Sequence, residues 1–364
     1  MGLTALARTK AKVRRRMMAL DREINRPRVT VLTTGGTIAG QADQRSAHGY
    51  VAGGVSGVQL VASVPGLDCL AVLDVEQIAN VGSQDMSEAI WLALAARIRR
   101  IIDRDEAAGV VITHGTDTLE ETAFFLFNVL PFGKPVVLTG AMRPSDAPDA
   151  DGPANLRAAV QVAASPLSQG RGVLVVMNGA IHDPCRVVKT HTTALQAFAS
   201  PSSGPLGAVP IAVPAADPAA VRYFAPVPAA RRAAPLAVPQ TAPLPRVAIV
   251  YAHAGMDAAG IGHAVRDGAR GIVLAGLGNG NAPQAVLAAL ASAARQGVAV
   301  VRATRVPAGH VARNVEVDDN ASGFVAAGAL NPQKARVLLQ LLIANGITAP
   351  DAVQQAFNDG AGTG

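Results

Sequence analysis

The segment Val110–Thr122, VVITHGTDTLEET, decides the fold prediction for this chain. It begins with three β-branched apolar residues, as expected of a strand buried in a sheet, and this apolar run stops at Thr113. Polar residues and a glycine follow, and the apolar spacing from Leu119 onward is typical of a helix. A buried strand that leads into a helix places the intervening loop at the carboxyl end of a sheet, where ligands bind in open α/β folds.

The polar residues of this loop have two interpretations. Thr116 and Asp117 lie next to the predicted helix start, where short polar side chains cap free N–H groups. For an isolated pair, a cap and a turn is the simpler interpretation. A second hydroxyl-bearing glycine loop, Thr33–Gly40 (TTGGTIAG), follows another predicted strand, and the two loops together favour a functional site.

Strand and helix patterns alternate along most of the chain. This alternation predicts an α/β fold with a parallel sheet covered on both faces. The predicted strands of the first unit cover Arg28–Leu32, Leu70–Val75, Gln77–Val81, Val110–Ile112, Lys134–Leu138 and Gly172–Met177, with helices at Ser87–Arg104 and Asp151–Ala164. The predicted elements of the second unit cover Val247–Tyr251, Ala258–Asp267, Gly271–Ala275, Val298–Ala303 and Pro332–Ala344, with a further helix that has Pro283 near its start.

Composition divides the chain into four parts. A basic leader, expected to be disordered, covers residues 1–27, and an N-terminal α/β domain covers 28–212. An Ala/Pro-rich stretch at 213–245 is typical of a linker with little core of its own. A C-terminal α/β domain then covers 246–364.

Positive charge is concentrated at the N-terminus. The whole chain carries +6, and residues 1–28 hold nine Lys or Arg against two acids, or +7, so the other 336 residues together carry −1. A nearly neutral remainder argues against a nucleic-acid groove in the fold, so any affinity for nucleic acid or anionic lipid would belong to the leader. The leader lacks the apolar centre of a secretory signal, which predicts a cytoplasmic protein; the periplasm is the alternative if the true N-terminus differs.

Several classes of protein are disfavoured by what the sequence lacks. No apolar run reaches the length of a membrane span. The two cysteines, Cys69 and Cys185, suggest neither a disulfide framework nor a zinc site. His182 and His191 are too weak a pair to predict a metal site.

Hydroxyl or carboxamide groups follow several predicted strands of the first unit, together with one carboxylate: Thr37, Ser83, Gln84, Thr116 and Asp117. Because strand-end loops on one edge of a sheet converge, we expect these side chains to lie near each other. A threonine hydroxyl is a weak nucleophile until a neighbouring base removes its proton. Lys189 is the candidate base, and a lysine serves as one only where burial favours its neutral amine. Asp117 would favour the ammonium instead, or the pair could pass a proton through Thr116, and the sequence leaves both open.

The first glycine loop, Thr33–Gly40, also has a nucleotide-binding alternative. Glycines after a strand can cradle a phosphate at a helix N-terminus. The loop matches neither GxGxxG nor GxxxxGK[ST]. Two threonine-bearing glycine loops without a phosphate signature fit acyl transfer better, because backbone N–H groups in such loops can hold an oxyanion.

The motifs resemble a known family. TGGTIAG at Thr34–Gly40, GSQDM at Gly82–Met86 and THGTDTLEET at Thr113–Thr122 look like segments of the bacterial-type L-asparaginases, the asparaginase/glutaminase family. Further similar segments are LTGAMRP at Leu138–Pro144, DGPANL at Asp151–Leu156, VKTHTT at Val188–Thr193, GNGN at Gly278–Asn281, VEVDD at Val315–Asp319 and GALNPQKARVLLQLL at Gly328–Leu342. The resemblance covers about Val29 to Phe357 and is strongest to the type II group.

The resemblance implies roles for the residues at matching positions. Thr37 would be the nucleophile, although the family leaves open whether it or Thr116 attacks first. The catalytic residues that it implies are Thr37, Tyr50, Thr116, Asp117 and Lys189. The substrate-binding residues that it implies are Ser83, Gln84, Thr116, Asp117, Ala141, Asn281 and Glu316, the last two from a neighbouring subunit.

The resemblance also implies a fold, an assembly and an activity. A larger N-terminal parallel-sheet domain and a smaller C-terminal α/β domain would form a homotetramer of intimate dimers, without cofactor or metal. The implied reaction is hydrolysis of L-asparagine to L-aspartate and ammonia through an acyl-enzyme. L-Glutaminase side activity is expected because one methylene group discriminates weakly between substrates. The alternatives are an amidase for another amide and a non-catalytic amino-acid-binding protein on the same scaffold.

Overall fold

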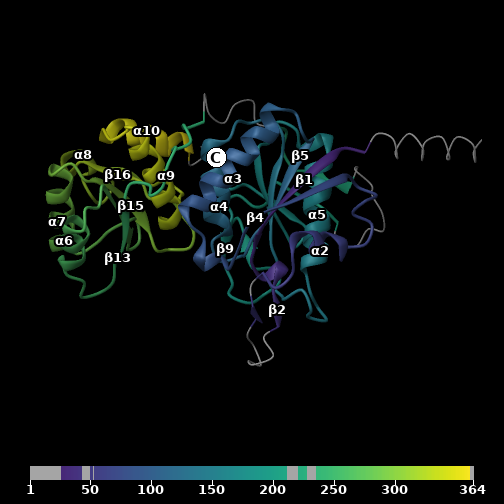
Figure 1. Ribbon diagram of the computed structural model, residues 1–364. Helices are drawn as coiled ribbons and strands as arrows, with labels where there is room; N and C mark the ends of the chain where they lie inside the picture. Colours follow the sequence, from purple (N-terminus) through teal and green to yellow (C-terminus); the bar gives the residue numbers. More distant parts are fainter. Residues whose placement is uncertain (1–25, 43–49, 52, 211–219, 228–234, 361–364) are drawn as a thin grey trace, which may run out of the picture.

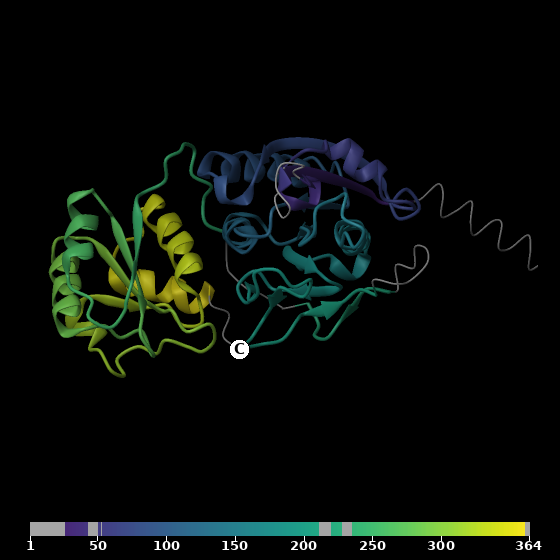
Figure 2. The same ribbon diagram turned by 90° about the horizontal axis from the view of Figure 1, so that it is seen from below.

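The computed structural model describes residues 26–42, 50–51, 53–210, 220–227 and 235–360, which form two α/β units (Figure 1). Each unit is built on its own sheet, and Figure 2 shows the two lying side by side. Most of the predicted leader, and the centre of the predicted polar loop 41–57, lie outside the described residues. Within the described part of the chain, no helix is long and apolar enough to span a bilayer.

The larger unit contains an eight-stranded sheet in the order β12-β11-β8-β7-β6-β5-β1-β4. Five neighbouring strands are parallel: β4 (Val72–Val81), β1 (Arg28–Gly35), β5 (Gly109–Thr113), β6 (Val136–Thr139) and β7 (Val173–Met177). The predicted parallel sheet is therefore confirmed. Three short antiparallel strands extend it: β8 (Ala180–His182), β11 (Gly207–Ala208) and β12 (Arg222–Tyr223). They were not predicted, because strands of two or three residues carry no periodic pattern.

Helices cover both faces of this sheet, as predicted. They are α2 (Gly57–Ala62), α3 (Glu88–Asp103), α4 (Leu119–Val129) and α5 (Gly152–Ala164). Successive strand residues face opposite layers: Val110 and Ile112 of β5 join the core under α3 and α4, whereas Val111 joins the core under α2 and α5.

The prediction of two separate strands between residues 70 and 81 is wrong. Leu70–Val75 and Gln77–Val81 were expected as separate strands, but β4 runs without a break over Val72–Val81 and pairs with β1. Glu76, the residue between the two predicted strands, points to α3, where its Oε1 lies 2.6 Å from Nη2 of Arg97. An ion pair beside an edge strand lets a charged residue continue the strand.

The smaller unit contains a parallel four-stranded sheet in the order β13-β14-β15-β16. Its strands are β13 (Val247–Tyr251), β14 (Gly271–Gly276), β15 (Ala299–Thr304) and β16 (Phe324–Ala326). Helices α6 (Ala259–Arg266) and α7 (Gln284–Arg295) cover one face, and α9 (Pro332–Ala344) and α10 (Pro350–Gly360) cover the other. The predicted elements of this unit are confirmed, while β16 and α10 are additional.

The described residues of the predicted linker, 213–245, contact the large unit. Strand β12 pairs with β11 at the edge of the large sheet. Leu244 is buried, and its N–H donates to Oε2 of Glu88 on α3 at 2.6 Å. The first contact ties the linker to the sheet edge, and the second ties it to the layer of helices that also meets the smaller unit.

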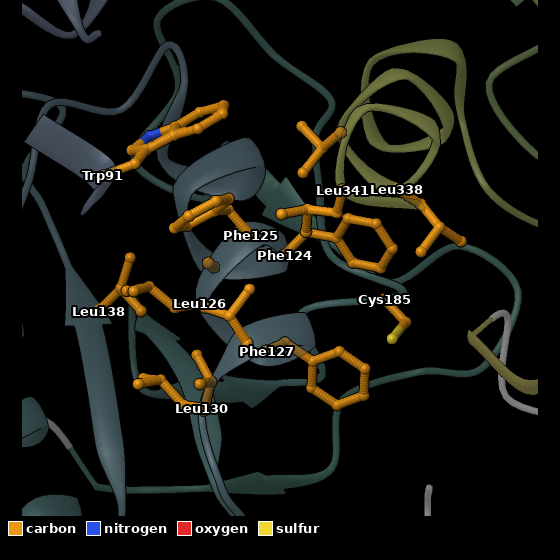
Figure 3. Packing of buried hydrophobic residues seen from close by; sticks show 14 of the residues in the cluster. Trp91, Phe124, Phe125, Leu126, Phe127, Leu130, Leu138, Cys185, Leu338 and Leu341 are labelled. Carbon is orange, nitrogen blue, oxygen red and sulfur yellow. The ribbon is translucent and has the colours of Figure 1, made fainter. Parts of the chain in front are cut away.

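The two units share a hydrophobic core between α4 and α9. Figure 3 shows Phe124 of α4 facing Leu338 and Leu341 of α9, while Phe125 stacks on Trp91 of α3 in the same core. Helix–helix packing of this kind buries large apolar surfaces and holds the two units together.

A buried ion pair crosses the same interface. Nζ of Lys334 on α9 lies 3.6 Å from Oε2 of Glu120 on α4, and both side chains are almost fully buried. The ammonium also donates to the carbonyl oxygens of Cys185, at 3.5 Å, and of Val187. Burial lowers the pKa of the Lys334 amine below its ordinary value, while Glu120 acts in the opposite direction. The second oxygen of Glu120 accepts from Nε2 of Gln333 at 2.6 Å.

We predict that Lys334→Met lowers the free energy of unfolding by about 3–5 kcal/mol, because it leaves Glu120 buried without its counter-charge. Adding Glu120→Gln removes the orphaned charge and should restore most of that loss. Arg246→Met, in the exposed pair with Asp267, is the control and should change stability much less. Urea denaturation monitored by circular dichroism measures all three. Equal losses in the single and double variants would contradict the ion-pair explanation.

Candidate active site

The carboxyl ends of the central parallel strands meet at one edge of the large sheet, and each leads into a polar loop. Thr37 begins the 3-10 turn η1 (Thr37–Ala39) that follows β1. Ser83 begins η2 (Ser83–Asp85) after β4, and Thr116 lies in the loop between β5 and α4. All three residues are buried, so their hydroxyls are held inside the molecule.

A backbone contact brings the Thr37 loop against the Thr116 loop. Gly36 has the left-handed φ of 79°, and its N–H donates to the Val81 carbonyl at 2.9 Å. A Cβ at Gly36 would lie 2.4 Å from both N and Cα of Gly115, so a side chain does not fit here. The expectation that these two loops converge is confirmed.

Ser83 connects the third loop to the same place. Its Oγ accepts a hydrogen bond from the N–H of Asp117 at 3.1 Å, and its carbonyl accepts one from Oγ1 of Thr118 at 2.8 Å. A Cβ at Gly115 would lie 2.7 Å from Oγ of Ser83. Because the Ser83 oxygen acts as acceptor, its own proton remains available to another acceptor.

Lys189 reaches the loop from a distant part of the chain. It ends β9 (Val188–Lys189), which pairs with the antiparallel strand β10 (Phe198–Ala199). Its Nζ lies 2.9 Å from Oγ1 of Thr116 and 2.6 Å from Oδ1 of Asp117. The Lys189 side chain is 17% exposed and that of Asp117 is 57% exposed, so the amine is sheltered while the carboxylate faces outward.

This arrangement supports proton transfer at Thr116. A lysine amine at hydrogen-bond distance from a threonine oxygen can hold an alkoxide as the ammonium, or accept the hydroxyl proton as the neutral amine. Both possibilities that the sequence left open are compatible with the observed distances.

A chain of buried hydrogen bonds supports the Thr116 loop from behind, and the sequence prediction missed it. The carbonyl of Gly115 only accepts, so Nδ1 of His114, at 2.7 Å, is the protonated ring nitrogen. Nε2 then accepts from Oγ1 of Thr122 at 2.8 Å, and this hydroxyl accepts from Nε1 of Trp91 at 2.7 Å. Burial lowers the pKa of His114 to about 4, so the ring is neutral at physiological pH. The available signal was a histidine at the end of an apolar strand.

The remaining predicted residues of the large unit contribute less polar contact. Gln84 is exposed, and its Nε2 donates to Oδ2 of Asp85 at 3.2 Å. Ala141 is fully buried after β6. Tyr50 lies in β3 (Tyr50–Val51), which pairs with β2 (Gln41–Ala42), but its side chain falls outside the described residues.

Asn281 and Glu316 lie on the smaller unit, where they contact each other. Nδ2 of Asn281 donates to Oε2 of Glu316 at 2.8 Å, and Glu316 is exposed. Oδ1 of the Asn281 side chain accepts a hydrogen bond from the N–H of Ala282 at 2.9 Å. These polar contacts run within the smaller unit and do not join the Thr116 cluster of the same chain.

Comparison with known proteins agrees with this geometry. The family model of the asparaginase N-terminal domain matches residues 28–220, and that of the glutaminase/asparaginase C-terminal domain matches residues 246–357. The chain belongs to the asparaginase family.

Individual relatives of this asparaginase-family chain are similar over nearly their whole length. It is 46% identical to L-asparaginase 2 of Escherichia coli (strain K12) over 334 residues, covering 91% of this chain and 93% of the relative. It is 45% identical to a probable periplasmic L-asparaginase of Haemophilus influenzae, covering 92% and 93%. A glutaminase-asparaginase of Pseudomonas fluorescens biotype A is 38% identical, covering 86% of each.

Metal ligands do not cluster in this family member as far as the structure describes it: no group of three or more His, Cys, Asp or Glu side chains has a suitable arrangement. Cys69 is exposed and Cys185 is buried, and the two do not form a disulfide with each other.

We predict that His114 makes stability depend on pH. Its pKa is about 4 in the folded protein against an ordinary value of 6.5, so the unfolded chain binds the proton first as pH falls. Stability is therefore lost between those two values, by about 2 kcal/mol between pH 7 and pH 5 for this group. The His114→Asn variant lacks the titrating group. Between pH 7 and pH 5 its free energy of unfolding should therefore fall by about 2 kcal/mol less than that of the parent protein. Urea denaturation at both pH values measures this, and an identical pH dependence would contradict it.

Proposed function

We propose that this chain is an amidohydrolase that converts L-asparagine to L-aspartate and ammonia through a threonine-bound acyl-enzyme. The observation that carries the proposal is the contact of Lys189 Nζ with Thr116 at 2.9 Å and Asp117 at 2.6 Å, beside the loop that holds Thr37. Relatives named L-asparaginase support the choice of substrate. Two hydroxyls and a lysine at one sheet edge suit attack on an amide carbon.

In the proposed reaction, Oγ1 of Thr37 attacks the side-chain amide carbon of asparagine. A C–O bond forms, the C–N bond then breaks, and ammonia leaves with an added proton. Water hydrolyses the resulting ester, which releases aspartate and restores the hydroxyl. Thr116 and Lys189 are the candidates for moving these protons, a contribution of about 10²–10⁴ in rate for general acid–base catalysis.

The α-groups of the substrate have complementary partners. The proton of the Ser83 hydroxyl is available to a carboxylate, because its oxygen already accepts from the Asp117 N–H. The outward-facing carboxylate of Asp117 suits an α-ammonium group. Gln84, Ala141 and Tyr50 complete the proposed pocket on the strength of the motif resemblance.

Glutamine is a proposed secondary substrate. It differs from asparagine by one methylene, which is typically worth only about 1–3 kcal/mol of discrimination. A relative named glutaminase-asparaginase supports this. The alternatives are an amidase for another amide and a binding protein without turnover. Binding would require neither a nucleophile nor the sheltered amine beside Thr116, so hydrolysis is the better-supported function.

We further infer that the active chain is a homotetramer of intimate dimers, with Asn281 and Glu316 completing the site of a neighbouring subunit. The exposed position of the Glu316 carboxylate supports this, since it leaves the group free for a partner. In this scheme residues 28–212 form the catalytic domain and residues 246–364 the domain that reaches the neighbour. The cytoplasm stays the predicted compartment, and the name of the H. influenzae relative favours the periplasmic alternative.

We predict that Thr37→Ala lowers ammonia release from asparagine by at least about 10³-fold while the protein stays folded, because the change removes the proposed nucleophile. Thr33→Val is the matched control: Thr33 is buried on β1, the strand that leads into the Thr37 turn, and its Oγ1 has no hydrogen-bond partner. Its activity should stay near that of the parent. Ammonia release with asparagine, glutamine and a buffer blank measures this. Turnover of Thr37→Ala within a few-fold of the parent would refute the assignment.

We predict that Thr37→Ala and Glu316→Ala chains complement each other. In a mixed dimer one site collects both defects and the other has neither, so random reassembly of equal amounts should restore about a quarter of the parent activity. Two different affinity tags isolate the mixed oligomers after joint dissociation and reassembly. Mixed oligomers that form without regaining activity would contradict a site shared between subunits.

A further inference from the structure

A fully buried arginine lies beneath the two loops that carry Asn281 and Glu316. Arg302 occupies the middle of β15, where the sequence otherwise reads as an apolar strand, and it is 0% exposed. One loop, Leu277–Asn281, follows β14, and the other, Val311–Asp318, leads into the short helix α8 (Asp319–Ser322). A charge in this position is costly unless every one of its donors is satisfied.

All five N–H groups of Arg302 have hydrogen-bond acceptors. Three of these acceptors are backbone carbonyls of the two loops. Nη1 donates to the carbonyl oxygens of Asn279 at 3.0 Å and Gly280 at 3.1 Å. Nη2 donates to the carbonyl of Ala312 at 3.2 Å. The remaining donors form a bidentate pair with Asp319, from Nε to Oδ1 at 2.6 Å and from Nη2 to Oδ2 at 2.7 Å.

Asp319 extends this network to the segment before Glu316. Its Oδ2 also accepts from the N–H of Asn314 at 2.8 Å, and its own N–H donates to Oδ1 of Asn314 at 3.0 Å. Asn314 has a left-handed φ of 57°, a conformation that such paired hydrogen bonds can hold. The carboxylate thus determines the path of the chain two residues before Glu316.

The loops are also tied to each other at the same place. Oδ1 of Asn279 accepts from the N–H of Ala312 at 2.8 Å. The N–H groups of Leu277 and Asn281 each donate to the other residue's carbonyl at 2.7 Å, which closes the first loop. A Cβ at Gly280 would lie 2.8 Å from Cγ1 of Val311 and 3.1 Å from Nη1 of Arg302, so this close packing needs glycine.

We infer that Arg302, paired with Asp319, is a positioning residue that sets the Asn281–Glu316 pair for the active site of the neighbouring subunit. The inference rests on the proposed function, in which that pair completes the neighbour's site. The guanidinium touches no proposed substrate group. It fixes the carbonyls on either side of the functional side chains, so its effect reaches the substrate only through Asn281 and Glu316.

The first test compares Arg302→Lys and Asp319→Asn with the parent. A lysine keeps the positive charge. Unlike the planar guanidinium, however, its ammonium group cannot hydrogen-bond to the Asp319 carboxylate and three loop carbonyls at the same time. We expect KM for asparagine to rise about tenfold or more, the usual consequence of losing a charge-assisted contact, with a smaller change in kcat. Arg246→Lys, in an exposed pair of the same unit, is the control and should leave KM unchanged.

The second test asks whether Arg302 acts through the two loops. Arg302→Lys should not raise KM further when it is added to a chain that already carries Asn281→Ala and Glu316→Ala. The effects of substitutions at coupled residues are not additive. Mixed oligomers of Arg302→Lys and Thr37→Ala chains should regain sites with the parent KM, because the intact halves then meet.

Each outcome decides the inference. Unchanged KM in both single variants, or a full further rise in KM on the Asn281→Ala/Glu316→Ala chain, would overturn it. So would failure of both single variants to form folded oligomers, since the pair would then serve folding alone. If Thr37→Ala and Glu316→Ala chains fail to complement each other, the shared site itself is wrong. If they succeed while Arg302→Lys keeps the parent KM, only the role of Arg302 is wrong.

Discussion

The steric constraint on which the active-site region depends is the close contact between the backbones of Gly36 and Gly115. A parallel sheet brings the carboxyl ends of its strands to one edge. Side chains in the loops that follow would nevertheless keep neighbouring loops apart. The Thr37 loop reaches van der Waals contact with Gly115 only because Gly36 has no side chain, and Gly115 in turn leaves the space that Ser83 occupies. The positions of Thr37, Ser83 and Thr116 depend on that approach, since each lies two or three residues after a strand end at this edge.

Buried polar groups behind this edge hold the loops in place. The chain from Trp91 through Thr122 to His114 ends on the Gly115 carbonyl, so the neutral imidazole supports the loop without reaching the substrate side. Lys334 donates to two carbonyls just before Lys189 and pairs with Glu120 on the helix that follows Thr116. Burying either polar group costs free energy, and both are satisfied by loop carbonyls together with side chains of α4.

The same principle recurs in the smaller unit with a different cation. Arg302 is satisfied by loop carbonyls and by Asp319, and the loops so held present Asn281 and Glu316. A buried charge that draws its hydrogen bonds from loops rather than from regular strands and helices makes those loops rigid. The molecule therefore has two rigid loop clusters, one on each unit, and the hydrophobic packing of α4 against α9 sets their separation within a chain.

The sequence by itself determined the alternation of strands and helices, the convergence of Thr37, Ser83 and Thr116, and the family. These follow from local features: apolar periodicity, glycines after strands, and motifs only a few residues long. Only the tertiary structure decided that β4 is one strand, that short antiparallel strands extend the sheet, and that Lys189 contacts Thr116 across 73 positions of sequence. It also revealed the buried contacts of His114, Lys334 and Arg302. Their partners lie on other elements, so the local sequence shows at most a polar residue in or beside an apolar segment and not the contacts that this residue makes.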